Sequence, residues 1–436
     1  MYYEPICHGS VDTIPAIIKT RRRFGGEGDA APVRREALEV VMVALHEDQD
    51  MAGQLERTLI GAYCDAADLG EALAVAGRVA PGDYDQWHDE WSKAAAVAQG
   101  AAADAASRGH ATLAARGYLR SAEYHRQSYF FLRHDLADDR VASGYYQQRE
   151  MFRAAIPLLA FAVESVSVPF SPVPMCGYLF RPTPVTDDPR PTVLFAGGFD
   201  GTAEELHKYG VRVALELGWN ALAWDGPGQG GMLVEHGQTF RPDFENVLTP
   251  VVDWVRQQPF ADSGRVLLMG RSLGGYFAPR GASGEHRIAA LVCDPGQFDF
   301  TSRAAAMFSP QDWQRVLDAD PEMDASLEGF LAKPRDLEFY GARMASMGAA
   351  TFGAWLRAVS SYTLADRADK ITCPTLITEG EGDFASQSKV LFEALTCEKQ
   401  YHAFTTAEGA GGHCEGMGQR LWEQIAFGWL SAVAAR

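Results

Sequence analysis

Positive charge is scarce in this chain. Its 436 residues include 39 lysines and arginines against 57 aspartates and glutamates, which gives a formal net charge of −18. Nucleic acids and anionic membrane surfaces both demand a basic face on their partner, so we expect neither as a ligand. The remaining composition, with 47% hydrophobic and 22% charged residues, is that of an ordinary globular protein with ample material for a core.

Long apolar runs and cysteine motifs are also missing. The nearest approach to a membrane-spanning run, IPLLAFAVESVSV, is interrupted by Glu164, so no membrane association is expected. The first residues lack the basic and apolar regions of a secretory signal. No Cys-x-x-Cys pair occurs, so neither a zinc site nor a disulfide framework is expected, and a cytoplasmic location is predicted. The seven cysteines are widely scattered: Cys7, Cys64, Cys176, Cys293, Cys373, Cys397 and Cys414.

The pattern of the chain changes near Val166. The preceding residues form long alanine-rich segments with apolar residues at helical spacing, which predicts a helical N-terminal domain over residues 1–165. From Val166 onward, short β-type runs alternate with amphipathic helical segments. This alternation predicts a second domain over residues 166–436, an α/β domain whose mostly parallel, doubly wound sheet is covered by helices on both faces.

One stretch interrupts the alternation. Residues 298–369 are helix-like and rich in methionine and aromatic residues. An insertion at the carboxyl end of a strand lies where ligands bind in this architecture, so we interpret it as a helical lid. Six large side chains in it are expected to divide between packing the lid and lining an apolar pocket: Met307, Trp313, Met323, Met344, Met347 and Trp355.

The sequence RVLLMGRSLGGYFAPR places a serine between glycines where a strand must become a helix. Gly270 to Gly274 match G-x-S-x-G, the nucleophile elbow of α/β-hydrolases. An ordinary strand-to-helix loop is the alternative, but the preceding run of strand and helix units favours the elbow. Ser272 is therefore the predicted nucleophile. Pro279 falls inside the predicted helix, where it should remove a backbone hydrogen bond.

A serine hydroxyl needs a base and an orienting carboxylate. In an α/β-hydrolase these follow the serine in the order acid, then histidine. The strand-like PTLIT is followed by a glycine turn in which Asp383 is the best-placed acid, Glu381 is a rival and Glu379 lies too close to the strand. His413 follows the last strand in a glycine-rich loop and is the predicted base.

Developing negative charge on the substrate oxygen requires two backbone N–H donors. One should come from Leu273, the residue after the nucleophile. The other should come from the glycine loop after the strand TVLFA, where we favour Phe199, with Gly198 as the alternative. A second glycine loop, WDGPGQGG, lacks the lysine and Ser/Thr of a phosphate-binding loop and is interpreted as a turn. No metal or nucleotide motif is found, so no cofactor is expected.

At this point the chain resembles a known group of α/β-hydrolases. The segments GGFDGTAEEL, WDGPGQGG, GRSLGGYFAPR and EGAGGHCEG, behind a helical N-terminal region, are similar to the group that contains 2,6-dihydroxypseudooxynicotine hydrolase, fungal polyketide chain-shortening hydrolases and FrsA-like proteins. The resemblance spans nearly the whole chain. It implies a serine hydrolase that cleaves a carbon–carbon bond beside a ketone, with Ser272, Asp383 and His413 matching the triad of the group. It also implies a homodimer.

The resemblance further suggests where the substrate binds. In this group the pocket lies between the helical and catalytic domains, and the segment GYLRSAEYHRQSYFF is similar to the one at that junction. Tyr124, His125 and Tyr129 are therefore pocket candidates, with packing inside the helical domain as the alternative. Asp294 is a further candidate for holding a substrate or polarising a ketone, or else a turn residue before Pro295.

The expected ligand is a small apolar or aromatic ketone or ester. Cleavage of a β-diketone or an aryl ketone is the favoured reaction. An esterase or thioesterase would use the same triad, because the chemistry differs only in the leaving group. A lyase, cyclase or acyltransferase of a biosynthetic pathway is a third possibility, and a non-enzymatic binding protein is disfavoured by the intact Ser, Asp and His set.

Overall fold

The computed structural model describes residues 45–436, which lie in one compact unit. The N-terminal part of the predicted helical domain, residues 1–44, and with it Cys7, lies outside the described residues. The division of the chain at residue 165 stays a prediction, although the helices end before the first strand begins. No helix of the described region has the length and apolar composition needed to cross a membrane.

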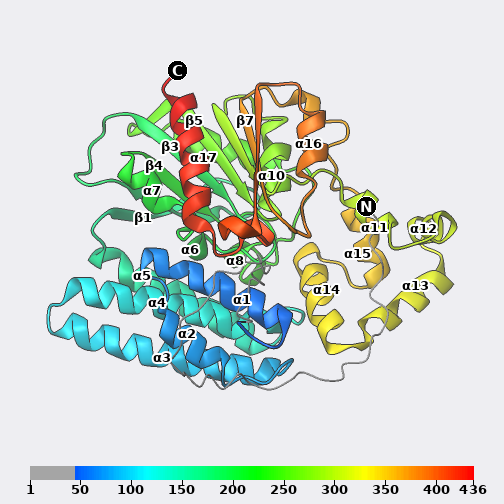
Figure 1. The fold of residues 1–436 in the computed structure, drawn as a ribbon, viewed down its shortest axis with the longest axis horizontal. Coiled ribbons are helices and arrows are strands. Elements are labelled where there is room, and N and C mark those ends of the chain that lie inside the picture. The colour runs from blue at the N-terminus through cyan, green and yellow to red at the C-terminus, as the bar shows by residue number, and fades with distance from the viewer. Residues whose placement is uncertain (1–44) are drawn as a thin grey trace, which may run out of the picture. The chain divides into compact units, whose positions relative to one another are not determined.

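The first layer is helical (Figure 1). Four of its α-helices begin at aspartates, namely Asp48, Asp68, Asp83 and Asp138, whose carboxylates accept hydrogen bonds from free N–H groups of the first turn. Small residues allow the helix backbones to approach closely. At the contact of α3 (Tyr84–Ser107) with α4 (Ala111–Tyr129), a Cβ atom at Gly117 would lie only 2.7 Å from the Ala102 Cβ atom. The helices and 3-10 turns are α1 (Gln49–Leu59), η1 (Ile60–Cys64), α2 (Leu69–Ala76), α3 (Tyr84–Ser107), α4 (Ala111–Tyr129), η2 (Phe130–Leu132), α5 (Asp139–Ala155) and η3 (Ile156–Leu158).

The second layer is an eight-stranded sheet in the order β1-β2-β4-β3-β5-β6-β7-β8. The pairs β1–β2 and β2–β4 are antiparallel, and the remaining pairs are parallel. The predicted mostly parallel α/β fold is therefore confirmed. The strands are β1 (Ala162–Val168), β2 (Met175–Arg181), β3 (Arg190–Ala196), β4 (Asn220–Trp224), β5 (Ala261–Arg271), β6 (Ala290–Asp294), β7 (Thr375–Gly380) and β8 (Lys399–Phe404).

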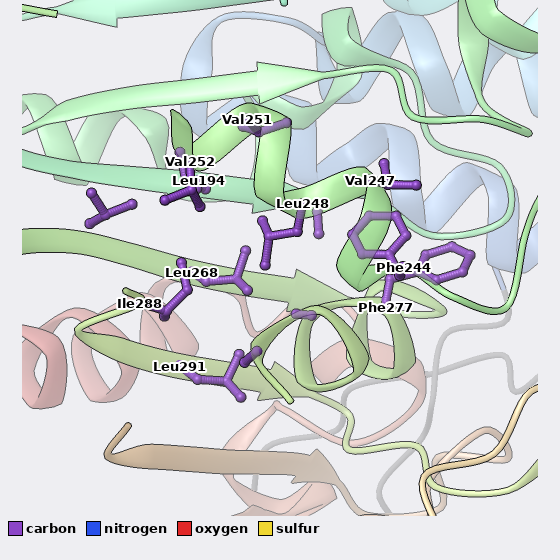
Figure 2. Close-up of a cluster of buried hydrophobic side chains, with 14 of the residues drawn as sticks. Leu194, Phe244, Val247, Leu248, Val251, Val252, Leu268, Phe277, Ile288 and Leu291 are labelled. Carbon is purple, nitrogen blue, oxygen red and sulfur yellow. The ribbon is translucent and has the colours of Figure 1, made fainter. Parts of the chain in front are cut away.

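Helices cover both faces of this sheet, which explains why the inner parts of its central strands are largely apolar, as in TVLFA of β3 and VLLMG of β5. On one face, α9 (Glu245–Arg256), α10 (Gly274–Ala282) and α16 (Ser388–Ala394) enclose one hydrophobic cluster. Figure 2 shows α9 side chains pointing toward Leu194 of β3 and Leu268 of β5. On the other face, α7 (Val211–Glu216) and α17 (Gln419–Ala434) enclose a second cluster. Two short helices, α6 (Ala203–Leu206) and α8 (Gly230–Val234), follow β3 and β4.

The residues between β6 and β7 form the expected helical insertion. Its helices have their own small core, which contains Met323, Met344, Phe352 and Leu356. In Figure 1 it is the yellow group beside the sheet. Its elements are α11 (Phe300–Ala305), α12 (Pro310–Leu317), α13 (Pro321–Leu327), η4 (Glu328–Ala332), α14 (Pro334–Met347) and α15 (Phe352–Val359). The 3-10 turn η5 (Ala368–Lys370) leads back to the sheet.

The segment TAEELHKYGVRVALELG reads as one helix but forms two, α6 and α7. Gly210 lies between them with φ of 105°, and a side chain there would come within 2.5 Å of the Phe427 ring. Close packing of α17 therefore breaks the helix at a glycine. The break places the polar residues of α6 against the helical layer.

Buried charges join that layer to the sheet. Glu205 of α6 accepts hydrogen bonds from Arg57 of α1, and its Oε1 lies 3.2 Å from Nζ of Lys208. Lys208 also lies 2.8 Å from Glu123 of α4, which pairs with Arg126. These side chains are almost fully removed from solvent, apart from Arg57. Because an unpaired buried charge is costly, the cluster fixes how α1 and α4 sit on α6.

His207 lies beside this cluster and predicts a pH effect on stability. Its Nδ1 lies 2.7 Å from the Glu204 carbonyl oxygen and its Nε2 3.5 Å from the Cys64 thiol, an environment for a neutral ring. Burial lowers the pKa of His207 from 6.5 to about 4. The unfolded chain therefore binds more protons between these values, so His207 reduces stability as pH falls from 6.5 to about 4 and has no further effect below.

We expect His207→Gln to flatten this part of the curve of melting temperature against pH. The exposed His110, whose side chain caps no helix, supplies the control variant His110→Gln, which should keep the wild-type slope. An unchanged slope in His207→Gln would contradict the assignment.

Candidate active site

The elbow predicted from Gly270 to Gly274 is present. Strand β5 ends at Arg271, α10 begins at Gly274, and Ser272 lies between them with φ of 58°. Such a conformation is rare for a residue with a side chain and turns the hydroxyl away from the sheet. The Ser272 N–H donates to the Asp294 carbonyl at 2.7 Å, which holds the turn against β6.

Close contacts leave room only for glycine on both sides of the serine. A Cβ atom at Gly270 would lie 2.0 Å from the Gly274 carbonyl oxygen, and one at Gly274 would lie 2.2 Å from that of Ala196. At Gly275 the distance to the Pro295 carbonyl oxygen would be 1.9 Å. The turn therefore has no room for larger residues.

Pro279 has a structural explanation that was not visible in the sequence. Because proline has no N–H, the carbonyl of Gly275 one turn earlier is left free. That carbonyl accepts the N–H of Gln297 at 3.1 Å, and Nε2 of Gln297 donates to the Ser272 carbonyl at 2.7 Å. The interrupted helix thus provides the anchor for a residue that braces the elbow.

Ser272, His413 and Asp383 form one hydrogen-bonded chain. The Ser272 Oγ lies 2.9 Å from His413 Nε2, and His413 Nδ1 lies 2.9 Å from Asp383 Oδ1. The Asp383 carboxylate also accepts the N–H groups of Cys414 at 3.0 Å and Ala385 at 2.8 Å. Burial alone would raise the pKa of Asp383, but these bonds and the His413 ring hold it below its usual value. Asp383 is thus a carboxylate that fixes His413 with Nε2 facing the serine.

The rival acids lie elsewhere. Glu381 is exposed and accepts the N–H of Thr406 at 2.8 Å. Glu379 is bound by the hydroxyls of Tyr401 and Ser386. Neither carboxylate contacts His413.

The loop that carries His413 is held from behind. Cys414 and Glu415 both have positive φ, 51° and 58°, and the Cys414 carbonyl accepts a hydrogen bond from Arg271. The Arg271 guanidinium stacks on Tyr209 and Trp422, with centroid distances of 4.7 and 5.0 Å. The last residue of β5 thus holds the loop that carries His413.

Asp294 does not reach the substrate space. It is fully buried, its Oδ1 accepts the Thr378 hydroxyl at 3.1 Å, and its Oδ2 lies 3.2 Å from Arg271. Burial and the facing Asp294 charge raise the pKa of Glu415 far above its usual value. Asp294 therefore supports Arg271 and the turn, which corrects its interpretation as a substrate contact.

The expected oxyanion donors lie next to the nucleophile. A Cβ atom at Gly198 would be only 2.8 Å from Ser272 Cβ and 3.1 Å from Leu273 N, so the loop after β3 passes directly over the elbow. Within residues 45–436, the N–H groups of Phe199 and Leu273 have no acceptor. Free amides at this position can bind a developing negative charge.

Asp200, which follows Phe199, ties this loop to the helical layer. Its Oδ1 lies 2.7 Å from Arg133, and its carbonyl accepts a hydrogen bond from Arg57 at 3.2 Å. Burial would raise the pKa of Asp200, but Arg133, Arg343 and Arg57 keep it well below its usual range. No residue pattern singled out Asp200, because its partners come from distant helices.

A cavity of about 540 Å³ opens at Ser272 and His413. Its walls come from α1, η2, the loop after β3, and the lid helices α11, α14 and α15. Met307 and Trp355 line it as the lid composition suggested, whereas Met323 and Met344 pack inside the lid. Nine aromatic residues face this space: Phe130, Phe131, Phe199, Tyr209, Phe300, Phe339, Tyr340, Trp355 and Phe384.

The three candidates on α4 lie away from this cavity. Tyr124 is fully buried against Trp91, and its hydroxyl donates to Glu71 at 2.7 Å. His125 is largely buried, and burial lowers its pKa to about 4. Tyr129 donates to Gln148 and borders a separate small pocket. The side of α4 that bears Tyr124 faces α2 and α3, so these residues pack the helical layer.

One group of potential metal ligands occurs among the described residues, namely Asp383, His413 and Cys414, with ligand atoms within 4.8 Å of one another. Asp383 and His413 are already hydrogen-bonded to each other. A metal here would compete with the chain from Ser272 to Asp383, so the group does not suit a resident cofactor.

Two sequence-family profiles match the chain. The family described as "Esterase FrsA-like" matches residues 80–299, and the "Alpha/beta hydrolase family" matches residues 193–420. Fold and elbow define the class as α/β-hydrolase, an enzyme class. More particularly, the chain belongs to the FrsA-like family within it.

Similar proteins include fungal hydrolases. Hydrolase acrC of Aspergillus aculeatus is 29% identical over 402 residues, which cover 86% of this chain and 94% of acrC. The 20-hydroxy-prefusarin hydrolase FUS2 of Gibberella moniliformis is 30% identical over 388 residues, which cover 85% and 93%. The crystal structure of 2,6-dihydroxy-pseudo-oxynicotine hydrolase shares the fold with a TM-score of 0.69 at 22% identity, over 87% of this chain and 95% of that one.

The elbow contacts predict a sharp difference between two glycine substitutions. Gly275→Ala should cost about 3 kcal/mol or more of unfolding free energy, because its methyl group would overlap the Pro295 carbonyl. Gly428→Ala, in an exposed position of α17 with nothing within 4 Å, should stabilise by about 0.5–1 kcal/mol. Urea unfolding measures both changes. Equal effects would show that the elbow is not tightly packed.

The hydrogen-bonded chain predicts an activated serine. A small fluorophosphonate should add once to the wild-type protein, at Ser272, and not at all to Ser272→Ala. His413→Gln and Asp383→Asn should react about 10²–10⁴-fold more slowly, because the base is lost or wrongly oriented. Intact-mass analysis with peptide mapping follows the adduct. An adduct at another residue, or undiminished reaction in His413→Gln, would contradict this assignment.

Proposed function

We propose that the protein is a serine hydrolase that cleaves a carbon–carbon bond next to a ketone in an aromatic or polyketide-like small molecule. Ser272, His413 and Asp383 are the proposed triad, and the N–H groups of Phe199 and Leu273 the proposed oxyanion hole. The observation that carries the proposal is the 2.9 Å contact between Ser272 Oγ and His413 Nε2 at the floor of an aromatic cavity.

The reaction would begin with attack of Ser272 Oγ on the ketone carbon while His413 Nε2 takes the hydroxyl proton. The carbonyl oxygen becomes an alkoxide held by the two amides. When the carbonyl re-forms, the carbon–carbon bond breaks and its electron pair leaves on the neighbouring carbon. That carbanion must be stabilised, as the enolate of a second carbonyl or by a phenol ring, and it receives the proton from His413. The acyl group then remains on Ser272.

Water would complete the cycle. His413 takes a proton from water as the water oxygen attacks the acyl carbon, and it returns this proton to Ser272 Oγ when the ester bond breaks. The products are a carboxylic acid and, depending on the leaving carbon, a ketone or a phenol. Enclosure by the helical layer and the lid favours small substrates over proteins.

The names of similar proteins support a small-molecule substrate. FUS2 is a 20-hydroxy-prefusarin hydrolase, and a structure with the same fold is a 2,6-dihydroxy-pseudo-oxynicotine hydrolase. Ester hydrolysis is the second candidate, because the matching family is described as esterase-like. The homodimer and the cytoplasmic location expected from the sequence stay predictions.

Turnover of matched substrates tests the proposal. An aryl β-diketone and an aryl ester of equal size should be compared by kcat/KM in wild type, Ser272→Ala and His413→Gln. We expect diketone cleavage to a carboxylic acid that contains one oxygen from isotope-labelled water, and a loss of about 10³-fold or more in each variant. Rapid ester turnover with an untouched diketone would establish the esterase instead. Diketone turnover that survives in Ser272→Ala but not in His413→Gln would show that His413 acts as a base without a covalent intermediate on the serine.

A further inference from the structure

The wall of the cavity contains arginines with different surroundings. Arg57, Arg133 and Arg271 each have a carboxylate partner, in Glu205, Asp200 and Asp294 respectively. Their charges are therefore balanced inside the protein and hold its layers together.

Arg343 differs from these three. It lies on lid helix α14, lines the cavity, and donates one hydrogen bond, from Nη1 to the Phe339 carbonyl at 2.6 Å. Its guanidinium stacks 3.5 Å from the centroid of the Phe339 ring and lies 5.3 Å from that of Phe199. Within the described part of the chain, no carboxylate oxygen comes within ion-pair distance of it. Its remaining N–H donors have no acceptor in that part either.

This charge is half-buried in the cavity wall and has no carboxylate partner within ion-pair distance among the described residues. Burial lowers the pKa of Arg343, and the more distant charges of Asp200 and Glu338 offset only part of that effect. Asp200 pairs with Arg133 and lies 3.7 Å from Arg57, and it does not come within ion-pair distance of Arg343. A planar guanidinium with unused parallel donors matches the geometry of a carboxylate. An anionic group in the cavity would therefore supply the counter-charge and the hydrogen-bond acceptors that Arg343 lacks.

Glu338, five residues earlier on α14, lines the same cavity. Burial raises its pKa to about 7, against the opposing charges of Arg133 and Arg343, with Asp200 and Asp50 acting in the raising direction. Below that pH it is a neutral acid and does not repel an anion beside Arg343. Above that pH it is a carboxylate and does.

We propose that the cavity binds substrates that carry a carboxylate remote from the reacting ketone, and that Arg343 is the residue that recognises it. The Phe199 ring lies beside Arg343, and the N–H of the same residue faces the elbow. The substrate carboxylate would thus be held on the lid side while its ketone meets Ser272. This inference names the substrate class of the proposed hydrolase. Cleavage of such a substrate rests on the proposed function, whereas its binding at Arg343 does not.

Binding can be measured without turnover. Calorimetry on Ser272→Ala should compare benzoylpropionate, an aryl keto acid, with benzoylpropionamide, its neutral carboxamide. We expect the acid to bind about tenfold to a hundredfold more tightly, as for other hydrogen bonds to a charged group. Adding Arg343→Met should abolish this preference, and Arg343→Lys should keep part of it. Arg212→Met, which removes an exposed arginine of α7 paired with Glu216, should leave it unchanged.

Two results would overturn the inference: equal binding of acid and amide, or a preference that survives Arg343→Met in a protein with an unchanged melting temperature. If Arg343→Met does not fold, the Arg343→Lys variant decides, since a preference of full wild-type size would show that the guanidinium fork is not needed. The preference should also fall as pH rises through about 7, and Glu338→Gln should remove this fall. If diketone cleavage fails, these binding results still test the inference, because binding is measured without turnover. Diketone cleavage without any carboxylate preference would refute the inference alone.

Discussion

Glu205 is the point at which the layers of this protein meet. Its carboxylate accepts hydrogen bonds from Arg57 of α1 and from Tyr209, and it lies within ion-pair distance of Lys208 and Arg126. A buried cluster of this kind adds little net stability, because removing each charge from water is costly. Its effect is on geometry: the observed docking of the helices gives each of these buried charges a partner, and a shifted docking would leave charges unpaired. The cavity exists because that docking leaves α1 and η2 opposite the elbow.

The same cluster reaches the proposed oxyanion hole. Arg57 bridges from Glu205 to the carbonyl of Asp200, and Asp200 follows Phe199 in the loop that passes over Ser272. The elbow is fixed from the other side by the Gly275 and Gln297 contacts. The proposed donors and the proposed nucleophile are thus held by separate elements of the fold. Such preorganisation is what stabilises charge in a transition state without rearrangement.

Much of the fold and of the candidate site could be predicted from the sequence. There are physical reasons why the rest could not. Ser272 and His413 lie in local glycine patterns whose backbone demands are visible in a few residues. The order of strands and helices likewise follows from apolar periodicity. For Tyr124 the sequence left a pocket position and packing in the helical layer open, because only the neighbours of an aromatic side chain on a helix decide between them, and here these are Trp91 and Glu71. Arg343 was missed because a missing partner becomes visible only when every nearby carboxylate has been placed.

Gln297 has a consequence for protein engineering. It holds the Ser272 carbonyl with its side chain and the Gly275 carbonyl with its backbone, and it immediately precedes the lid. The first residue before the lid therefore also holds the turn that carries Ser272. A lid transplanted from a relative should keep the recipient's Gln297, with the crossover placed after it. A chimera joined before this residue would change specificity and loosen the serine in the same step.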